Sequence, residues 1–434
     1  MKNFFLFAIA ALFMSSCQSD DTADSSFSMK AAGADYSGYP VTVQTVSGDV
    51  TTNTTWTNDR VWEISGVIRV KSGATLTIQP GTFIKGKPLA AGVATGVLVI
   101  TKTGKINAQG TATAPIIFTS YKLLDGNAAT TGYPGDFGGV VILGDAEVNT
   151  WVTTNVVEGL GDQPNVNDFY YGGTNNTHNA GALNYARIEF AGRILDLGVE
   201  INGLTLAGVG SGTVLHHIQV SYARDDSFQF FGGTVNASHL VSFAPYDDNF
   251  DFDLGYTGTI TKAIALADSN SLHSFAGSGV GSPDSNGIEL DNNASGTTTL
   301  LITRPVISEM SIIGVSSTTV ADLYENAIHV RRLGQIRFTD VTVTGYNRGV
   351  YWESPSLQSA SFWAGISIHG FDTPILPAGT FIGLGNTAST VNPAPKWGLT
   401  QPFFNDGALD LSGNTGAFKT EANWTNTWTK FNNF

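Results

Sequence analysis

Acidic residues recur in pairs within two short stretches of alternating sequence. Asp251 and Asp253 lie in Phe250-Asp251-Phe252-Asp253, and Glu289 and Asp291 lie in Ile288-Glu289-Leu290-Asp291. Alternate residues of a strand share one face, so both acids of each stretch are expected to point away from its apolar pair. If the two strands are neighbours, the carboxylates are in like-charge contact, which is unfavourable unless a cation, a basic residue or a raised pKa relieves it. Grouped carboxylate oxygens suit Ca²⁺.

A third stretch, Ile328-His329-Val330-Arg331, places a histidine and an arginine where the other two place acids. Arg331 is then expected next to Asp291, where its guanidinium neutralises a carboxylate without any metal. Two interpretations stay open: a metal or catalytic site, or a solvated charge ladder that ends in a salt bridge. The candidate catalytic residues are Asp251, Asp253, Glu289, Asp291, His329 and Arg331, and the first four are also the candidate metal ligands.

A second set of aspartates stands immediately before two of the alternating stretches. Asp225 and Asp226 align with Asp247 and Asp248, 22 residues further along the chain. Stacked corners rich in aspartate form either a further metal or sugar site, or a ladder of Asx turns in which side chains bond backbone groups at the bend. These four residues are the second choice for a metal site.

The elements that must position these residues follow from a repeat. HIQVSYARDDSFQFFGG begins at His217, HLVSFAPYDDNFDFDLG begins at His239, and the two align without a gap. A short period with strand-like alternation is typical of a solenoid whose rungs stack on one another. The two histidines are predicted to stack as a structural column.

Six alternating tetrads, each with an inward apolar pair, are predicted to stack as one parallel sheet. They begin at Val199, Phe228, Phe250, Ile288, Ile328 and Val350. Because parallel crossovers are nearly always right-handed, the predicted fold is all-β, a single right-handed parallel β-helix of roughly 22 residues per rung with loop insertions. One outward column is predicted to run through Glu200, Gln229, Asp251, Glu289, His329 and Tyr351. The other is predicted to run through Asn202, Phe231, Asp253, Asp291, Arg331 and Glu353.

The composition agrees with a solenoid and excludes one class of partner. The chain has 434 residues, of which 13% are charged, and its formal net charge is −14. Nucleic-acid binding needs a basic surface, so no nucleic-acid partner is expected. The chain has one cysteine, so no internal disulfide can form and stability must come from the stacking of rungs.

The N-terminus carries an export signal. Residues 1–16 contain Lys2 and an apolar run that is too short for a spanning helix, as is typical of a signal peptide. Met14-Ser15-Ser16-Cys17 resembles a bacterial lipobox, which implies that Cys17 is lipidated and anchors the protein to a membrane. Residues 17–38 are predicted to be a disordered tether, and residues 39–434 to be the β-helix domain with a C-terminal cap.

Several phrases resemble a family of Bacteroidota surface lipoproteins to which no reaction is assigned. Ser19-Asp20-Asp21 resembles the acidic export tag of such proteins. The phrases Gly132-Tyr133-Pro134-Gly135-Asp136-Phe137-Gly138-Gly139 and Trp424-Thr425-Asn426-Thr427-Trp428, together with the two Asp-Asp stretches, belong to the same resemblance. It implies a lipid-anchored protein of the outer membrane, displayed at the cell surface.

Insertions and the C-terminal region interrupt the repeat. Residues 150–181 are rich in Asn and Gly, and a long loop of this kind is usually functional or disordered. Residues 268–286 and 316–326 form shorter insertions. Residues 397–434 carry three tryptophans and are predicted to close the C-terminal end of the solenoid.

The predicted architecture resembles that of pectate lyases and polygalacturonases, which place acidic, calcium-binding or basic residues on outward strand positions. The resemblance implies carboxylates for calcium or acid catalysis and Arg331 as a base or uronate clamp, although the Gly-His-Gly phrase of polygalacturonases is absent. The expected function is a non-catalytic surface module that binds a glycan, a matrix component or an outer-membrane protein partner. The alternative is a polysaccharide lyase or glycoside hydrolase, and a third expectation is a structural subunit of an outer-membrane complex.

Overall fold

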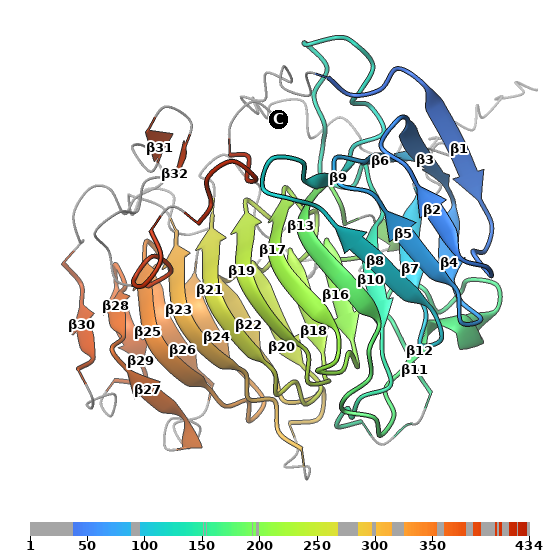
Figure 1. Ribbon diagram of the computed structural model, residues 1–434. Coiled ribbons are helices and arrows are strands. Elements are labelled where there is room, and N and C mark those ends of the chain that lie inside the picture. The colour runs from blue at the N-terminus through green and yellow to red at the C-terminus, as the bar shows by residue number, and fades with distance from the viewer. Residues whose placement is uncertain are drawn as a thin grey trace, which may run out of the picture.

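The computed structural model describes residues 38–87, 96–150, 152, 154–192, 194–196, 199–267, 285–296, 301–314, 325–353, 360–378, 385–391, 404–405, 408–409, 416–422 and 424–431. Strands stack side by side along the length of the molecule (Figure 1). They form two long parallel sheets whose inward side chains share one apolar core. The predicted all-β parallel β-helix is confirmed.

Within the described residues, the first sheet, sheet I, has ten strands, and all its neighbouring strands are parallel. In spatial order they are β4 (Val67–Val70), β7 (Val97–Ile100), β10 (Gly139–Leu143), β16 (Leu204–Ala207), β18 (Phe228–Phe231), β20 (Phe250–Asp253), β22 (Ile288–Leu290), β24 (Asn326–Val330), β26 (Arg348–Trp352) and β29 (Thr373–Leu376).

The second sheet, sheet II, has sixteen strands in the part of the chain that the structure describes. Its main path is β1 (Val43–Ser47), β3 (Val61–Ser65), β6 (Phe83–Lys87), β9 (Ile116–Thr119), β13 (Gly181–Glu189), β17 (Val214–Ser221), β19 (Asn236–Phe243), β21 (Thr259–Leu266), β23 (Val306–Ile313), β25 (Arg337–Thr344), β28 (Ser367–His369) and β30 (Thr387–Ser389). Beside this path lie β2 (Thr54–Trp56), β5 (Thr75–Ile78), β8 (Lys105–Gln109) and β27 (Phe362–Ala364).

The long strands of sheet II are bent at one residue, and this residue has no partner in the strand register. On β17 and β19, His216 pairs with Ser238 and Ile218 with Leu240, so His217 and His239 are skipped. Each skipped residue has a positive φ, a conformation that L-residues adopt only when their surroundings enforce it. We call these residues the bend column: Tyr185, His217, His239, Lys262, Glu309 and Asp340, with φ between 46° and 58°.

The bend divides each rung of sheet II into two arms. At the N-terminal end the arms are separate strands, since β8 pairs with the first half of β13 and β9 with its second half. At the C-terminal end they separate again, since β25 pairs with both β27 and β28. Gly365 lies between those two strands with a φ of 65°, where glycine adopts the bend without strain.

The inward pairs of sheet I stack as predicted. Phe228 lies on Phe250 with ring centroids 4.9 Å apart, and Phe230 lies on Phe252 at 5.0 Å. All four rings are fully buried. One predicted rung is wrong: the strand beside β18 is β16, in which Leu204 pairs with Phe228. Glu200 and Asn202 are therefore outside the two outward columns, because Val199–Glu200 forms β15, which pairs antiparallel with β14 (Ile194–Asp196).

Part of the insertion predicted at residues 150–181 folds over the outward side of sheet I. Its elements are β11 (Asn155–Val156), a 3-10 helix η2 (Val166–Phe169) and β12 (Tyr170–Tyr171), and β11 pairs antiparallel with β12. A second apolar cluster forms between them and the sheet, with Leu160, Phe169 and Tyr171 packed near Val141 and Ala207. We call residues 155–171 the cover. Gln229 points outward as predicted but is only 3% exposed.

The C-terminal segment lies along the flank of the solenoid. Residues 416–422 and 424–431, which we call the strap, run from β25 back towards β13 and β17. Lys419 pairs with Asp340 at 2.6 Å, and the amide of Lys430 donates to Gln219 at 2.8 Å. Phe418, Trp424, Trp428 and Phe431 pack on the outward side of the second arms in a third apolar cluster. The described part of the predicted cap therefore covers the side of several rungs.

The remaining antiparallel pair in the described residues is β31 (Phe404–Asn405) with β32 (Ala408–Leu409). Within the same residues, no helix has the length and apolar character needed to cross a membrane.

Candidate functional site

From β18 onwards, the residues of each predicted outward column of sheet I lie beside one another on neighbouring strands. In the first column Asp251 pairs with Gln229 and Glu289, and His329 pairs with Glu289 and Tyr351. In the second column Phe231 pairs with Asp253. That column continues through Asp291, Arg331 and Glu353, whose amides donate to Phe252, Leu290 and Val330 of the preceding strands at 2.9, 2.9 and 3.1 Å. We call this surface, from Asp251 to Glu353, the polar face.

Two guanidinium groups neutralise one end of the polar face. Arg331 donates to Glu289, and its Nε lies 3.5 Å from Asp291 Oδ1. Arg332 donates to Asp291 Oδ2 at 2.6 Å. Burial raises the pKa of Asp291, and both guanidinium groups counteract the rise. The predicted salt bridge at Arg331 is therefore present, and Arg332, which sequence reasoning missed, adds a second one.

The carboxyl groups of Asp251 and Asp253 lie further from these cations. Burial raises the pKa of Asp253 to about 6, although its Oδ1 accepts a hydrogen bond from the amide of Leu254 at 2.6 Å. Burial, followed by the charge of Glu289, raises the pKa of Asp251 well above its ordinary value. The Oδ1 atom of Asp251 is buried without a hydrogen-bond partner within the described ranges. Both carboxyl groups therefore hold a proton more tightly than an ordinary aspartate does.

An imidazole and two phenols lie along the polar face. His329 lies 3.9 Å from Glu289 and 3.8 Å from Glu353, and its ring packs on Tyr351 at 4.9 Å. Tyr171 of the cover stacks on Phe231 at 6.1 Å. Burial, then the charges of Asp253 and Glu158, raise the pKa of Tyr171, which places the edge of the cover beside Asp253. The polar face therefore begins where the apolar cover ends.

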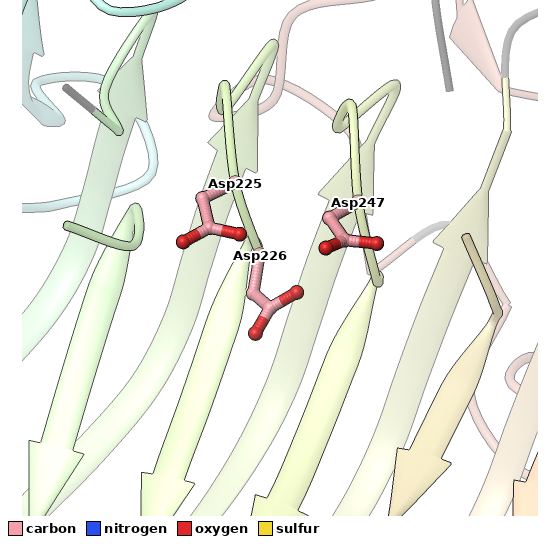
Figure 2. A group of neighbouring side chains, drawn as sticks. All are labelled: Asp225, Asp226 and Asp247. Carbon is pink, nitrogen blue, oxygen red and sulfur yellow. The ribbon is translucent and has the colours of Figure 1, made fainter. Parts of the chain in front are cut away.

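The second acidic set lies at the corner before β18 and β20. One carboxylate oxygen from each of Asp225, Asp226 and Asp247 lies within 4.8 Å of the other two. Figure 2 shows the three side chains side by side on two adjacent rungs. Burial, followed by the charges of Asp225 and Asp248, raises the pKa of Asp226 well above its ordinary value. The three oxygens are close enough together to share one cation.

The aspartates at this corner also accept hydrogen bonds from groups of the neighbouring rung. The Oδ1 atom of Asp226 accepts from the amide of Asp248 at 2.9 Å, and Asp248 Oδ1 accepts from the side chain of Asn286 at 3.0 Å. Asn202 accepts from the amide of Asp226 at 3.2 Å, one rung earlier. Asp226 and Asp248 therefore each link one rung to the next by hydrogen bonds. The other member of each pair, Asp225 and Asp247, is less buried.

The remaining predicted residues lie elsewhere. His217 and His239 stack with ring centroids 4.1 Å apart, in the bend column under the strap. His178 lies beside the backbone carbonyl of Lys102, with Nε2 at 3.1 Å from its oxygen. Cys17, residues 268–284 and residues 316–324 of the predicted insertions lie outside the described residues.

Comparison with known proteins identifies a family and a distantly similar solved structure. Residues 48–429 match the model of a family described as pectate-lyase like beta helix domain. The crystal structure of Dettilon tailspike protein (gp208) is similar with a TM-score of 0.28 and 12% identity, over 71% of this chain and 63% of that chain. No curated protein sequence matches the chain.

Proposed function

This chain belongs to the pectate-lyase-like β-helix domain family, and from that premise we propose that it is a carbohydrate-binding module displayed at the bacterial cell surface. The observation that supports this function is the polar face: carboxylates, guanidinium groups, an imidazole and a phenol stand on adjacent strands of a rigid sheet. Sugar hydroxyls both donate and accept hydrogen bonds, so carboxylates and guanidinium groups together can satisfy them. Groups placed on strands also hold their geometry better than groups on loops.

The location at the cell surface is part of the same proposal and rests on the sequence. Lipidation at Cys17 anchors the protein to the outer membrane, and Asp20 and Asp21 direct it to the outer surface. Replacing both aspartates with alanine is expected to leave the protein in the membrane fraction and to protect it from protease added to whole cells. Equal digestion of the variant and the wild type would contradict this location. An outer-membrane protein partner is compatible with this location.

Glycoside hydrolysis is the second candidate, favoured by the raised pKa of Asp253, about 6. A carboxyl group that is protonated near neutral pH can serve as the general acid that protonates a glycosidic oxygen. Glu289 and Asp291, which accept hydrogen bonds from Arg331 and Arg332, are the candidates for the second carboxylate that this reaction requires.

The proposal includes a calcium ion, bound by the carboxylates of Asp225, Asp226 and Asp247. Three carboxylate oxygens within 4.8 Å of one another offer hard ligands, and their repulsion is the physical reason for a cation to stabilise them. The polar face is a weaker choice for calcium, because Arg331 and Arg332 already neutralise Glu289 and Asp291.

One experiment tests binding and cleavage together. The mature protein in detergent is run through native gels cast with acidic or neutral polysaccharides, and the same polysaccharides are assayed for new reducing ends and unsaturated products. Retardation without products supports a binding module, and products support an enzyme. Asp253→Asn should weaken whichever activity is seen. Asp59→Asn, which changes an exposed aspartate paired with Arg60, should leave it unchanged. A protein that neither binds nor cleaves any polysaccharide would overturn the proposal.

A further inference from the structure

Three imidazoles touch one another beneath the strap. The Nδ1 atoms of His216 and His217 are 3.0 Å apart, and the ring of His217 stacks on that of His239 at 4.1 Å with an interplanar angle of 8°. Two strap tryptophans lie edge-on against this group: Trp428 is 5.5 Å from His217, and Trp424 is 5.1 Å from His239. The strap therefore rests directly on His217 and His239, and His216 is linked to the strap through His217.

These contacts require neutral rings. A hydrogen bond between two Nδ1 atoms needs a proton on one of them and a free lone pair on the other, so it is lost when both imidazoles are protonated. Two stacked imidazolium ions 4.1 Å apart also repel each other. Burial, and then the neighbouring histidines, lower the pKa of His217 to about 3, and burial and His239 lower the pKa of His216.

The other charged groups around the rings do not remove this constraint. The ring of Tyr185 stacks on the opposite side of His217 at 4.3 Å. Glu421 of the strap lies 3.1 Å from His239 Nε2, but its side chain is 50% exposed, so solvent screens it. Lys262, the next residue of the bend column, pairs with Glu309 at 3.3 Å and adds positive charge on that side.

Protons reach the rings from solvent. His216, Asn236 and Thr259 belong to the lining of an open groove of about 540 Å³ on the first arms of β17, β19 and β21. Because His216 lines this open groove, solvent reaches its ring without any movement of the chain.

The strap and the solenoid have separate cores. Trp424, Trp428 and Phe431 pack with Val241 and Ile264 on the outward side of sheet II. The inward residues Ile218, Leu240 and Ala263 belong to the central core, together with the stacked phenylalanines of sheet I. Undocking the strap therefore exposes one apolar face and leaves the inward contacts of every rung in place.

From this geometry we propose that the strap is an acid-released latch. Neutral His216, His217 and His239 hold the strap against the second arms, and protonation of the imidazole group undocks the strap while the solenoid remains folded. The released state exposes the apolar outward side of β19, β21 and β23 only in an acidic environment.

Hydrogen–deuterium exchange of the intact mature protein tests the latch. Strap amides, among them those of Ala417 and Lys430, which donate to Ser311 and Gln219, report the docked state. Their protection, corrected for the intrinsic rate, should fall about tenfold per pH unit below pH 6.5, because the undocked state binds the proton that the docked state excludes. Peptides from the inward strands should stay protected over the same range.

The variants keep the bend intact. His217→Phe replaces an imidazole with a ring that cannot titrate, and Tyr185 shows that an aromatic side chain is accommodated in the bend column at positive φ. This variant should keep the strap protected when the pH falls. His217→Asn, which tolerates the same backbone, serves if the phenylalanine variant does not fold. His178→Gln changes a histidine outside the column and should behave as the wild type.

Three results would overturn the latch. The strap of the wild type stays protected down to pH 4, or it loses protection together with the inward strands, or both His217 variants release the strap at the pH of the wild type. Loss of strap protection alone, shifted by either variant, supports it.

Discussion

The outward columns of sheet I and the bend column of sheet II stack side chains from one rung to the next, at about the spacing of neighbouring strands, 4.8 Å. In sheet I, Asp251 lies beside Glu289 and the cations come only at Arg331 and Arg332. In the bend column, Lys262 lies beside Glu309, and Asp340 contacts a lysine of the strap. The order of residue types along a column therefore decides whether it stabilises the fold.

The two columns also differ in the direction in which the pKa values of their carboxyl groups are shifted. Burial raises the pKa of Asp251, Asp253 and Asp291 on the polar face. In the bend column the pKa of Glu309 is lowered, because hydrogen bonds from Thr420 and Lys262 outweigh its burial. A surface that retains unfavourable carboxylates is suited to function, since perturbed groups cluster where ligands bind or reactions occur.

The largest effect is expected in the core that both columns surround. Phe252→Ala removes a fully buried ring stacked between neighbours and should lower the free energy of unfolding by about 3–5 kcal/mol. Phe362→Ala is the matched control, because that ring is 48% exposed on a first arm of sheet II. It should cost about 0.5 kcal/mol or less in chemical denaturation. A larger cost for Phe362→Ala than for Phe252→Ala would mean that the inward and outward faces are exchanged.

Breaking the ion pairs of the polar face should have the next largest effect. Arg331→Ala leaves the partly buried Glu289 without its nearest cation and is expected to cost about 2–3 kcal/mol. The cost should shrink in a Glu289→Gln background and persist in an Asp291→Asn background, because Arg332 also binds Asp291. Denaturation of the single and double variants measures both couplings. A cost that is independent of Glu289 would show that Arg331 acts through packing.

Removing an unrelieved acid should stabilise the protein. The folded pKa of Asp253, about 6, lies above the ordinary value, so the folded state binds the proton more tightly and stability falls as pH rises from about 4 through 6. Asp253→Asn should therefore be more stable than the wild type by about 2 kcal/mol near pH 8, and similar to it near pH 4. Thermal melts across this range measure the difference. A stability difference between the variant and the wild type that is the same at every pH would contradict the raised pKa of Asp253.

The smallest effect is expected from calcium. If the corner aspartates bind it, added calcium raises Tm by about 1–2 °C through its preference for the folded state. Asp225→Asn with Asp247→Asn should abolish the rise, and Asp253→Asn with Asp291→Asn should not. The opposite pattern would move the cation to the polar face, and no rise in any variant would leave the corner as a backbone-bonding ladder.

The sequence predicted the parts of the fold in which the repeat is uninterrupted. The gap-free step of 22 residues fixed the register of β18 against β20, and therefore the outward columns. The preceding rung was assigned wrongly because Val199–Asn202 and Leu204–Ala207 both alternate, and only the pairing with Phe228 distinguishes them. The bend was not predicted, because its column contains tyrosine, histidine, lysine, glutamate and aspartate, which share no pattern.

The candidate site was predicted in part for a similar reason. Strict alternation directs Arg331 outward and Arg332 inward. In the structure the strand ends there, and positive φ values of 44° at Arg332 and 71° at Leu333 bring the Arg332 side chain back to Asp291. The sequence also did not predict the contribution of the cover. Tyr171 reaches the polar face because a long insertion folds back over the sheet, and the path of that insertion depends on tertiary contacts.

The strap changes how the solenoid is expected to unfold. A solenoid in which each rung contacts only its neighbours frays from its ends, one repeat at a time. The strap instead joins residues 211 positions apart, as between Lys430 and Gln219, and 79 apart, as between Lys419 and Asp340. The rungs from β17 to β25 therefore cannot separate until the strap has detached, so they melt as one cooperative block. The strap must also dock late in folding, after those rungs have assembled, because the surface that receives it does not exist before then.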